Sequence, residues 1–141
     1  MKKCIITVVA LFVYIFIADM IFHGFLLRDT YMATAQLWRP EADMKSYMIY
    51  MIAGQFLIAL FMASIFTHGY KGTGIKEGVK FGLLLGGLEA GKNLIMYSVA
   101  PYPMSLTLSW IGIAFVESVI AGIILAKIWG NETCCGTGKA A

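Results

Sequence analysis

Ionisable and amide side chains interrupt segments of this chain that are otherwise apolar. The stretch FIADMIFHGFLL, residues 16–27, carries Asp19 and His23 four residues apart, which places them on one face of a helix. A charge at the centre of a bilayer costs about 2.5–3.5 kcal/mol, so such groups usually face the bundle interior and find partners there. The polar residues of this kind form one candidate network: Asp19, His23, Gln55, Glu89, Lys92, Asn93 and Glu117.

Three kinds of chemistry fit these residue types. A series of titratable groups at depth is typical of a proton or ion path. Two Glu, an Asp and a His in a helix bundle also suggest a carboxylate-bridged metal site, but such sites need Glu-x-x-His pairs, which this sequence lacks. The third interpretation is a charge-neutral network that fixes the register of the helices. The sequence predicts no metal and no cofactor, and it leaves a conducting or ligand-binding network and a structural network open.

Other motifs do not indicate an enzyme. GTGIKEG, residues 72–78, has the spacing GxGxxxG and follows no strand, so it is no dinucleotide fingerprint, and GLEAGKN, residues 87–93, lacks the P-loop spacing. No Ser/His/Asp or Cys/His nucleophile arrangement is visible. Cys4, Cys134 and Cys135 lie at the two ends, so they form no disulfide framework, and the paired thiols lack the CxxC spacing of redox sites. We expect a protein without catalytic activity.

The elements that hold the polar residues are membrane helices. The chain has 141 residues, of which 60% are hydrophobic and 13% charged, whereas soluble domains carry about 25% charged residues. A spanning helix needs roughly 20 apolar residues, and residues 4–27, 46–66, 78–99 and 104–129 meet that length. We predict an all-α, polytopic integral membrane protein with four transmembrane helices in an antiparallel bundle. Residues 1–130 form its single domain, and residues 131–141 form a short flexible cytoplasmic tail.

The distribution of basic residues predicts the orientation. Cytoplasmic loops carry an excess of Lys and Arg, which places both termini in the cytoplasm. The inner side then holds Lys2, Lys3, Lys71, Lys76, Lys80, Lys127 and Lys139, and the outer side holds Arg28, Arg39 and Lys45. The net charge of +3 reflects this topology, and no basic cluster with interleaved aromatic residues indicates nucleic-acid binding. The lipid bilayer is the expected surrounding.

The depths of the charged residues suggest which of them pair. At a rise of about 1.5 Å per residue, Asp19 and Lys92 both lie roughly 5 Å to the outer side of the midpoints of their segments. Glu89 and Lys92 are also neighbours at i, i+3 on one helix. We therefore predict a buried cluster of Asp19, Lys92 and Glu89, with His23 above it, near the outer surface, and Glu117 beside it.

Small residues recur every four positions in the last two segments. Such spacing lets helix backbones approach closely in lipid, where the hydrophobic effect does not drive helix association. We expect these two rows to face each other, within one chain or between copies. The rows are Gly78, Gly82, Gly86 and Ala90 in the third segment, and Ala114, Ser118, Gly122 and Ala126 in the fourth.

The connections carry boundary signals. LWRPEADM, residues 37–44, presents Trp38 and Arg39 in an outer loop and places Pro40 where the second helix begins. The preceding connection, residues 28–36, is long enough for a short interfacial helix. HGYKGTG, residues 68–74, predicts an inner turn with Gly69 as the C-cap. APYP, residues 100–103, predicts a short outer turn between two antiparallel helices.

Several of these motifs together resemble an uncharacterised family of small four-helix bacterial integral membrane proteins with no known activity. The likeness spans nearly the whole chain and consists of a D-x-x-x-H-G string, an L-W-R-P string, a G-T-G turn, a Pro-containing outer turn and a Glu on the last helix. Lys92 and the terminal Cys pair do not map onto it. The resemblance implies the bacterial inner membrane as location. The matching residues are Asp19, His23, Gly24, Tyr31, Trp38, Arg39, Pro40, Gly72, Gly74, Pro101 and Glu117.

Two classes of function remain from the sequence. The first expectation is a non-catalytic accessory subunit that packs with itself, as a homo-oligomer, or with a larger membrane complex. The alternative is a small oligomeric carrier of ions, protons or a solute that uses the polar network. A wet cavity beside His23 favours the carrier, whereas fully paired and dry polar groups favour the subunit.

Overall fold

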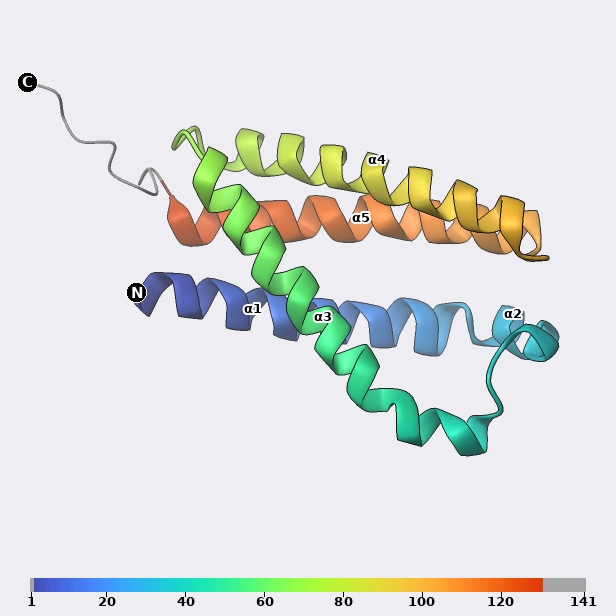
Figure 1. Ribbon diagram of the computed structural model, residues 1–141. Coiled ribbons are helices and arrows are strands. Elements are labelled where there is room, and N and C mark those ends of the chain that lie inside the picture. Colours follow the sequence, from blue (N-terminus) through green and yellow to red (C-terminus); the bar gives the residue numbers. More distant parts are fainter. Residues whose placement is uncertain (1, 131–141) are drawn as a thin grey trace, which may run out of the picture.

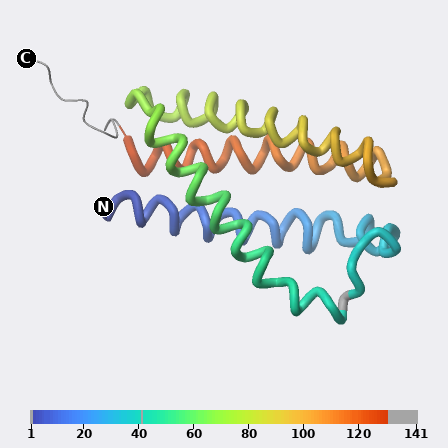
Figure 2. Tube along the Cα trace, viewed as in Figure 1, coloured from blue at the N-terminus to red at the C-terminus, as the bar shows by residue number. Residues whose placement is uncertain are grey.

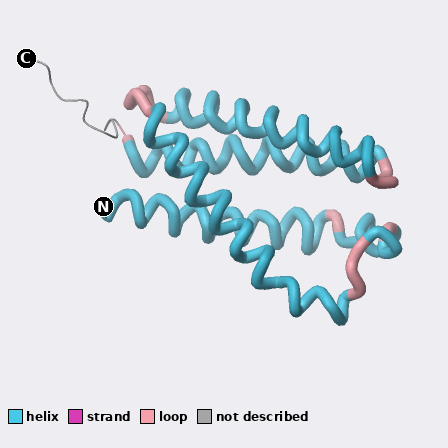
Figure 3. The backbone as a smooth tube through the Cα atoms, viewed as in Figure 1, coloured by secondary structure: helices cyan, strands magenta, loops and turns pink. Residues whose placement is uncertain are grey.

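The computed structural model describes residues 2–130, except for the side chain of Glu41, and consists of helices joined by short loops (Figure 1, Figure 3). No strand occurs within the described residues. The all-α fold predicted from the sequence is confirmed. The helices are α1 (Lys2–Asp19), continued by a π-helix (Met20–Leu26), α2 (Arg28–Ala33), a 3-10 turn (Ala35–Leu37), α3 (Glu41–Gly69), α4 (Ile75–Val99) and α5 (Met104–Trp129).

The long helices form two unequal pairs. α4 packs along α5, and α1 contacts both α5 and α3. α3 crosses α1 obliquely, so that only its C-terminal end approaches α4 (Figure 1, Figure 2). The ammonium of Lys3 lies 5.0 Å from the ring centroid of Trp129, which places the start of α1 and the end of α5 at the same end of the bundle.

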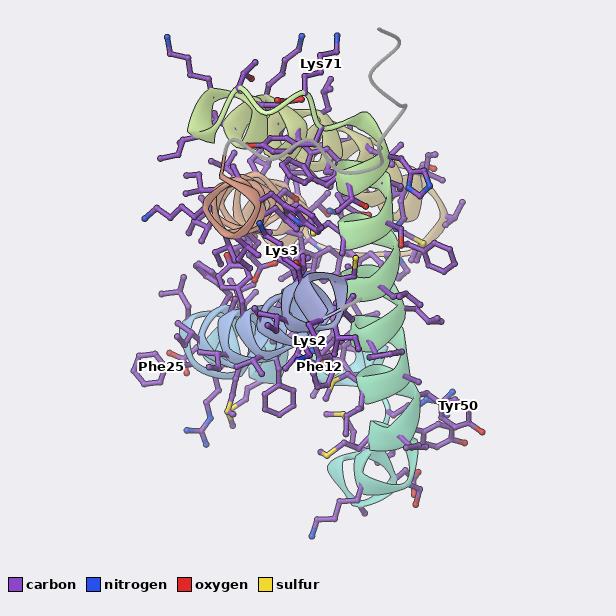
Figure 4. All side chains as sticks on the ribbon, turned by 90° about the vertical axis from the view of Figure 1, so that its left-hand side faces the viewer. Lys2, Lys3, Phe12, Phe25, Tyr50 and Lys71 are labelled. Carbon is purple, nitrogen blue, oxygen red and sulfur yellow. The ribbon has the colours of Figure 1, made fainter. Side chains whose placement is uncertain are left out.

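Three helical segments of the described chain are long and apolar enough to cross a membrane: Lys2–Leu26, Ala42–Gly69 and Met104–Trp129. Large apolar side chains cover their outer surfaces, and Phe25 and Tyr50, with 81% and 72% of their surface exposed, project away from the bundle (Figure 4). This surface is typical of a multi-pass membrane protein. α4 is not among the three segments, because Glu89, Lys92 and Asn93 interrupt its apolar run.

Glycines bring α4 and α5 into backbone contact. A Cβ atom built on Gly78 would lie 2.2 Å from the carbonyl oxygen of Gly122, and one on Gly82 would lie 2.4 Å from that of Ser118. Gly86 faces the ring of Phe115 at a comparably short distance. Because no side chain larger than hydrogen fits at these positions, the two rows of small residues lie against each other within one chain.

The outer members of the two rows differ from the central ones. Ala126 lies against Gly78, whereas Ala114 borders an internal cavity and Ala90 is half-buried beyond the close contact. The tight interface of α4 and α5 therefore occupies the half of the bundle near the termini. Toward the other end the helices leave room for larger side chains.

Two apolar clusters fix the ends of the bundle. Near the termini, Leu11, Ala59, Phe66 and Leu125 are buried among partners from α1, α3 and α5. At the opposite end, Leu27, Leu106 and Ile113 form a smaller cluster, against which aromatic side chains of the π-helix, α2 and α5 pack together with Trp38. The polar residues lie between these clusters.

The turn before α4 departs from the prediction. Gly69 is the last residue of α3 and not a C-cap, because the positive φ angles that favour glycine occur at Gly72 (80°) and Gly74 (77°). The carboxylate of Glu77 accepts hydrogen bonds from the backbone N–H groups of Lys71 and Thr73 at 2.8 and 3.1 Å. Burial acts to raise the pKa of Glu77, but these hydrogen bonds outweigh it and hold that pKa below its ordinary value.

The connections at the end of the bundle away from the termini follow the boundary signals more closely. α3 begins directly after Pro40, and α5 begins directly after Pro103, which ends the short turn between α4 and α5. The connection over residues 28–36 contains the short helix α2. The π-helix that precedes it was not predicted from the sequence.

We expect Gly82→Ala to destabilise the protein, because its new Cβ would meet the backbone of α5 and force the two helices apart. Overpacking of this kind costs about 1–3 kcal/mol of unfolding free energy. Chemical unfolding of the variant in mixed micelles measures this loss. Gly87→Ala is the matched control on the same helix, since nothing lies within 4 Å of its Cβ position. Equal stability of the two variants would contradict the close contact.

Candidate functional site

A cavity of about 550 Å³ lies among the four long helices, between the two apolar clusters. The residues that line it come from these four helices, from the π-helix and α2, and from the turn before α5. Its volume falls within the range of about 300–1,000 Å³ that is usual for ligand sites. The lining residues are Tyr14, Ile15, Asp19, His23, Tyr31, Ile58, Met62, Ile65, Leu85, Glu89, Asn93, Met96, Tyr102, Trp110, Ala114, Glu117, Ser118 and Ala121.

The helices contribute different chemistry to this cavity. α1, its π-helical continuation and α5 supply most of the polar atoms, including those of Asp19, His23 and Glu117. α3 presents only apolar side chains, Ile58 among them, whereas α4 mixes apolar residues with Glu89 and Asn93. The cavity thus has one acidic side and one mainly apolar side.

A chain of polar contacts begins at Asp19. The side-chain amide of Gln55, in α3, donates a hydrogen bond of 2.6 Å to Oδ2 of Asp19. Nε2 of His23 lies 3.9 Å from Oδ1 of the same carboxylate. Asp19 therefore links α1 to α3 and lies next to the imidazole of the π-helix.

The contacts continue from His23 to α2 and α5. Nδ1 of His23 lies 2.6 Å from the hydroxyl of Tyr31, and the indole N–H of Trp110 donates to that hydroxyl oxygen at 2.8 Å. Since an indole nitrogen can only donate, the Tyr31 oxygen accepts from Trp110 and its proton is available to Nδ1. This arrangement assigns the proton of neutral His23 to Nε2, which faces Asp19.

Aromatic rings gather at the end of the cavity that is remote from the chain termini. Trp38 stacks on Tyr102 with centroids 5.5 Å apart, and Trp110 meets Tyr102 edge-on at 5.1 Å. Tyr31 contacts Trp38 edge-on at 5.3 Å. Burial raises the pKa of Tyr31; the hydrogen bond from Trp110 opposes this increase, and the charge of Asp19 adds a smaller one, so the hydroxyl stays protonated and able to donate. The ring of Tyr31 thus contacts the rings of both His23 and Trp38.

The outer-loop residues Arg39 and Pro40 lie outside this cluster. The guanidinium carbon of Arg39 is 3.9 Å from the ring centroid of Tyr47, a cation–π contact to the start of α3. Pro40 precedes the first residue of that helix. Of the predicted loop residues, only Trp38 contacts the aromatic rings of Tyr31, Tyr102 and Trp110.

Glu117 lacks a side-chain partner among the described residues. Its Oε1 is buried without a hydrogen bond, although the hydroxyl of Tyr14 donates to its backbone carbonyl at 3.2 Å. Oε1 of Gln55 is also buried and unpaired. Buried polar atoms are usually hydrogen-bonded, and residues 2–130 offer these two oxygen atoms no partner.

The predicted pairing of Asp19 with Lys92 is wrong. Lys92 forms its ion pair with Glu89 on the same helix, at 3.0 Å, and 65% of its side chain is exposed. Asp19 lines the cavity, whereas Lys92 is not among the lining residues. The partner of Asp19 is Gln55 instead.

The structure thus divides the candidate network. Asp19, His23 and Gln55 are in contact, while Glu89, Asn93 and Glu117 share the cavity and Lys92 lies at the surface. Within residues 2–130 no group of three or more His, Cys, Asp or Glu side chains is placed to hold a metal ion. Cys4 is exposed, and Cys134 and Cys135 lie outside the described residues.

Sequence reasoning missed the tyrosines and the tryptophan that complete the site. Tyr14, Tyr102 and Trp110 line the cavity, and Tyr31 bridges His23 to Trp110. Tyr31 has an i, i+8 spacing from His23, which gave no signal because a π-helix and a turn lie between them. Tyr102 and Trp110 had the appearance of ordinary interfacial aromatic residues.

Comparison of the chain with models of protein families, with curated proteins and with solved structures found no match. The site is therefore interpreted from its own geometry.

We expect Tyr31→Phe to destabilise the outer end of the bundle, since it removes a hydroxyl that serves both His23 and Trp110. Leaving buried groups without a partner costs about 1–3 kcal/mol. The loss is to be measured as a decrease in the free energy of unfolding in mixed micelles. Tyr97→Phe removes the same atom from a tyrosine with 36% of its surface exposed and serves as the control. A loss no larger than that of the control would show that the bridge contributes nothing.

Proposed function

We propose that the protein is a small non-catalytic carrier in the bacterial inner membrane, with both termini in the cytoplasm. α4 is the fourth transmembrane helix in this proposal. Its 25 residues extend about 37 Å, more than the roughly 30 Å of a hydrocarbon core, and it packs along α5. Lys71, Lys76 and Lys80, near its start, then join the basic residues at the cytoplasmic end.

The observation that carries the proposal is the unpaired carboxylate of Glu117 in a cavity of about 550 Å³. A network that served only to fix helix register would leave its polar atoms paired and the space between them filled. Here Oε1 of Glu117, a residue that lines the cavity, has no hydrogen-bond partner among the described residues. A solute or water that enters the cavity supplies what is missing.

The contacts around His23 support a solute path toward the outer side. The imidazole connects Asp19, at depth, with Tyr31 and Trp110 at the outer loop. Intramembrane titratable residues arranged in this way are typical of transporters. The π-helix that carries His23 supports the same interpretation, because π-helical turns are frequent at functional sites.

A second candidate function, an accessory subunit, is favoured by the first part of α3. This part extends beyond α1, away from α4 (Figure 1, Figure 4), and Tyr47, Met48, Ile49 and Tyr50 are all exposed on different sides of the helix. A helix that stands free in a bilayer offers a surface for a second copy or for another membrane protein.

We expect a cysteine in the cavity to react with a membrane-impermeant thiol reagent added to the outer side. Ala114→Cys, in a background with the three native cysteines changed to Ser, should be labelled by the trimethylammonium methanethiosulfonate reagent. Ala114 lines the cavity, and a thiol reacts only where water allows it to ionise.

Val116→Cys is the matched control for this labelling. Val116 lies two residues away on α5, with 47% of its surface exposed on the lipid-facing side. It should remain unlabelled, since lipid excludes the reagent. Equal and low labelling at both positions would mean that the cavity is closed to water, and the carrier would be contradicted.

We expect native mass spectrometry after purification in mild detergent to find copies of this chain alone, as a homo-oligomer. Met48→Cys should then cross-link between copies, because Met48 is exposed on the free part of α3. A different membrane protein present in fixed ratio would instead support the accessory subunit. A strict monomer without cross-links would contradict the proposed role of the free α3 surface.

A further inference from the structure

We propose that the ligand of the cavity is an amphipathic organic cation, such as a hydrophobic amine or a quaternary ammonium or phosphonium ion. This inference rests on the proposed carrier function and names its ligand class. Three properties of the cavity support it, namely its charge, its aromatic rings and its apolar side.

The cavity is lined by more acidic than basic side chains. Asp19, Glu89 and Glu117 line it, and only Glu89 has a cationic partner, Lys92. Gln55 donates to Asp19 but carries no charge, and His23 as the Nε2–H tautomer is neutral. Because charges at membrane depth need a counter-charge, the two remaining carboxylates favour a cationic ligand and disfavour an anionic one.

The aromatic rings favour an organic cation over a metal ion. Tyr14, Tyr31, Tyr102 and Trp110 all border the cavity. Ring faces attract ammonium groups, and quaternary ammonium ions are recognised by such aromatic surroundings. A metal ion such as Ca²⁺ requires six to eight oxygen ligands, which the rings do not provide.

The remaining surface accommodates apolar groups. Ile58, Met62 and Ile65 from α3 face the acidic residues across the cavity, and Leu85 and Met96 extend this surface on α4. Methionine side chains adapt to ligands of differing shape. A cation bound at Glu117 can therefore place its apolar substituents between α3 and α4.

Two ions of nearly equal shape and opposite charge test the proposal. Tetraphenylphosphonium should bind the purified full-length protein saturably in isothermal titration calorimetry, whereas tetraphenylborate should show only the partition seen with empty micelles. Saturable binding of both ions with similar affinity would mean apolar partition into the cavity and would overturn the proposal.

Single substitutions test whether the carboxylate of Glu117 is the group that binds the cation. Glu117→Gln keeps the shape of the side chain and should weaken tetraphenylphosphonium binding at least tenfold. Glu77→Gln, the same change in the turn before α4 and away from this cavity, should bind as the unmodified protein does. Unchanged affinity in a folded Glu117→Gln protein would overturn the assignment of Glu117.

A second variant applies if Glu117→Gln does not fold. Tyr102→Leu removes one aromatic ring at the more exposed end of the cavity and should weaken binding of the phosphonium ion severalfold. Unchanged affinity there would contradict the aromatic contribution. Labelling of Ala114→Cys without phosphonium binding would reject the ligand class and leave the carrier function supported, whereas the absence of labelling would reject the carrier itself.

Discussion

The contact between the backbones of α4 and α5 determines how the other helices can pack. At Gly78, Gly82 and Gly122 the two helices approach until an added Cβ would lie 2.0–2.4 Å from a carbonyl oxygen of the partner. This contact uses one face of each helix and fixes their rotation. α1 packs against α5 and against α3, and residues from all four long helices line the cavity.

The same constraint decides which polar groups are paired. The rotation of α4 brings Lys92 to Glu89 and to the surface, and Asp19 receives its hydrogen bond from Gln55 of the oblique helix α3. Glu117 remains on the cavity side of α5 without a side-chain partner. Lys92 pairs with Glu89 on its own helix and does not line the cavity, so it supplies no counter-charge to Glu117.

The sequence contained enough information for the helices but not for their contacts. Pro40 and Pro103 marked the starts of α3 and α5, since proline suits the beginning of a helix, and the four-residue spacing of small residues indicated a close approach. The partner of Asp19 was not predictable, because matched depth leaves helix rotation undetermined. The link from His23 to Tyr31 depends on a π-helix, whose wider turn rotates every later side chain, and no residue pattern announced it.

The proposed function depends most directly on water reaching the side chain of Glu117. Solid-state NMR of the protein in lipid bilayers measures this access as magnetisation transfer from water. The transfer to the side-chain carboxyl carbon of Glu117 should build up nearly as fast as that to Glu77, which lies in the turn before α4. A build-up as slow as that of Val116, on the lipid-facing surface, would show a dry carboxyl group. That result would contradict an open cavity and the function derived from it.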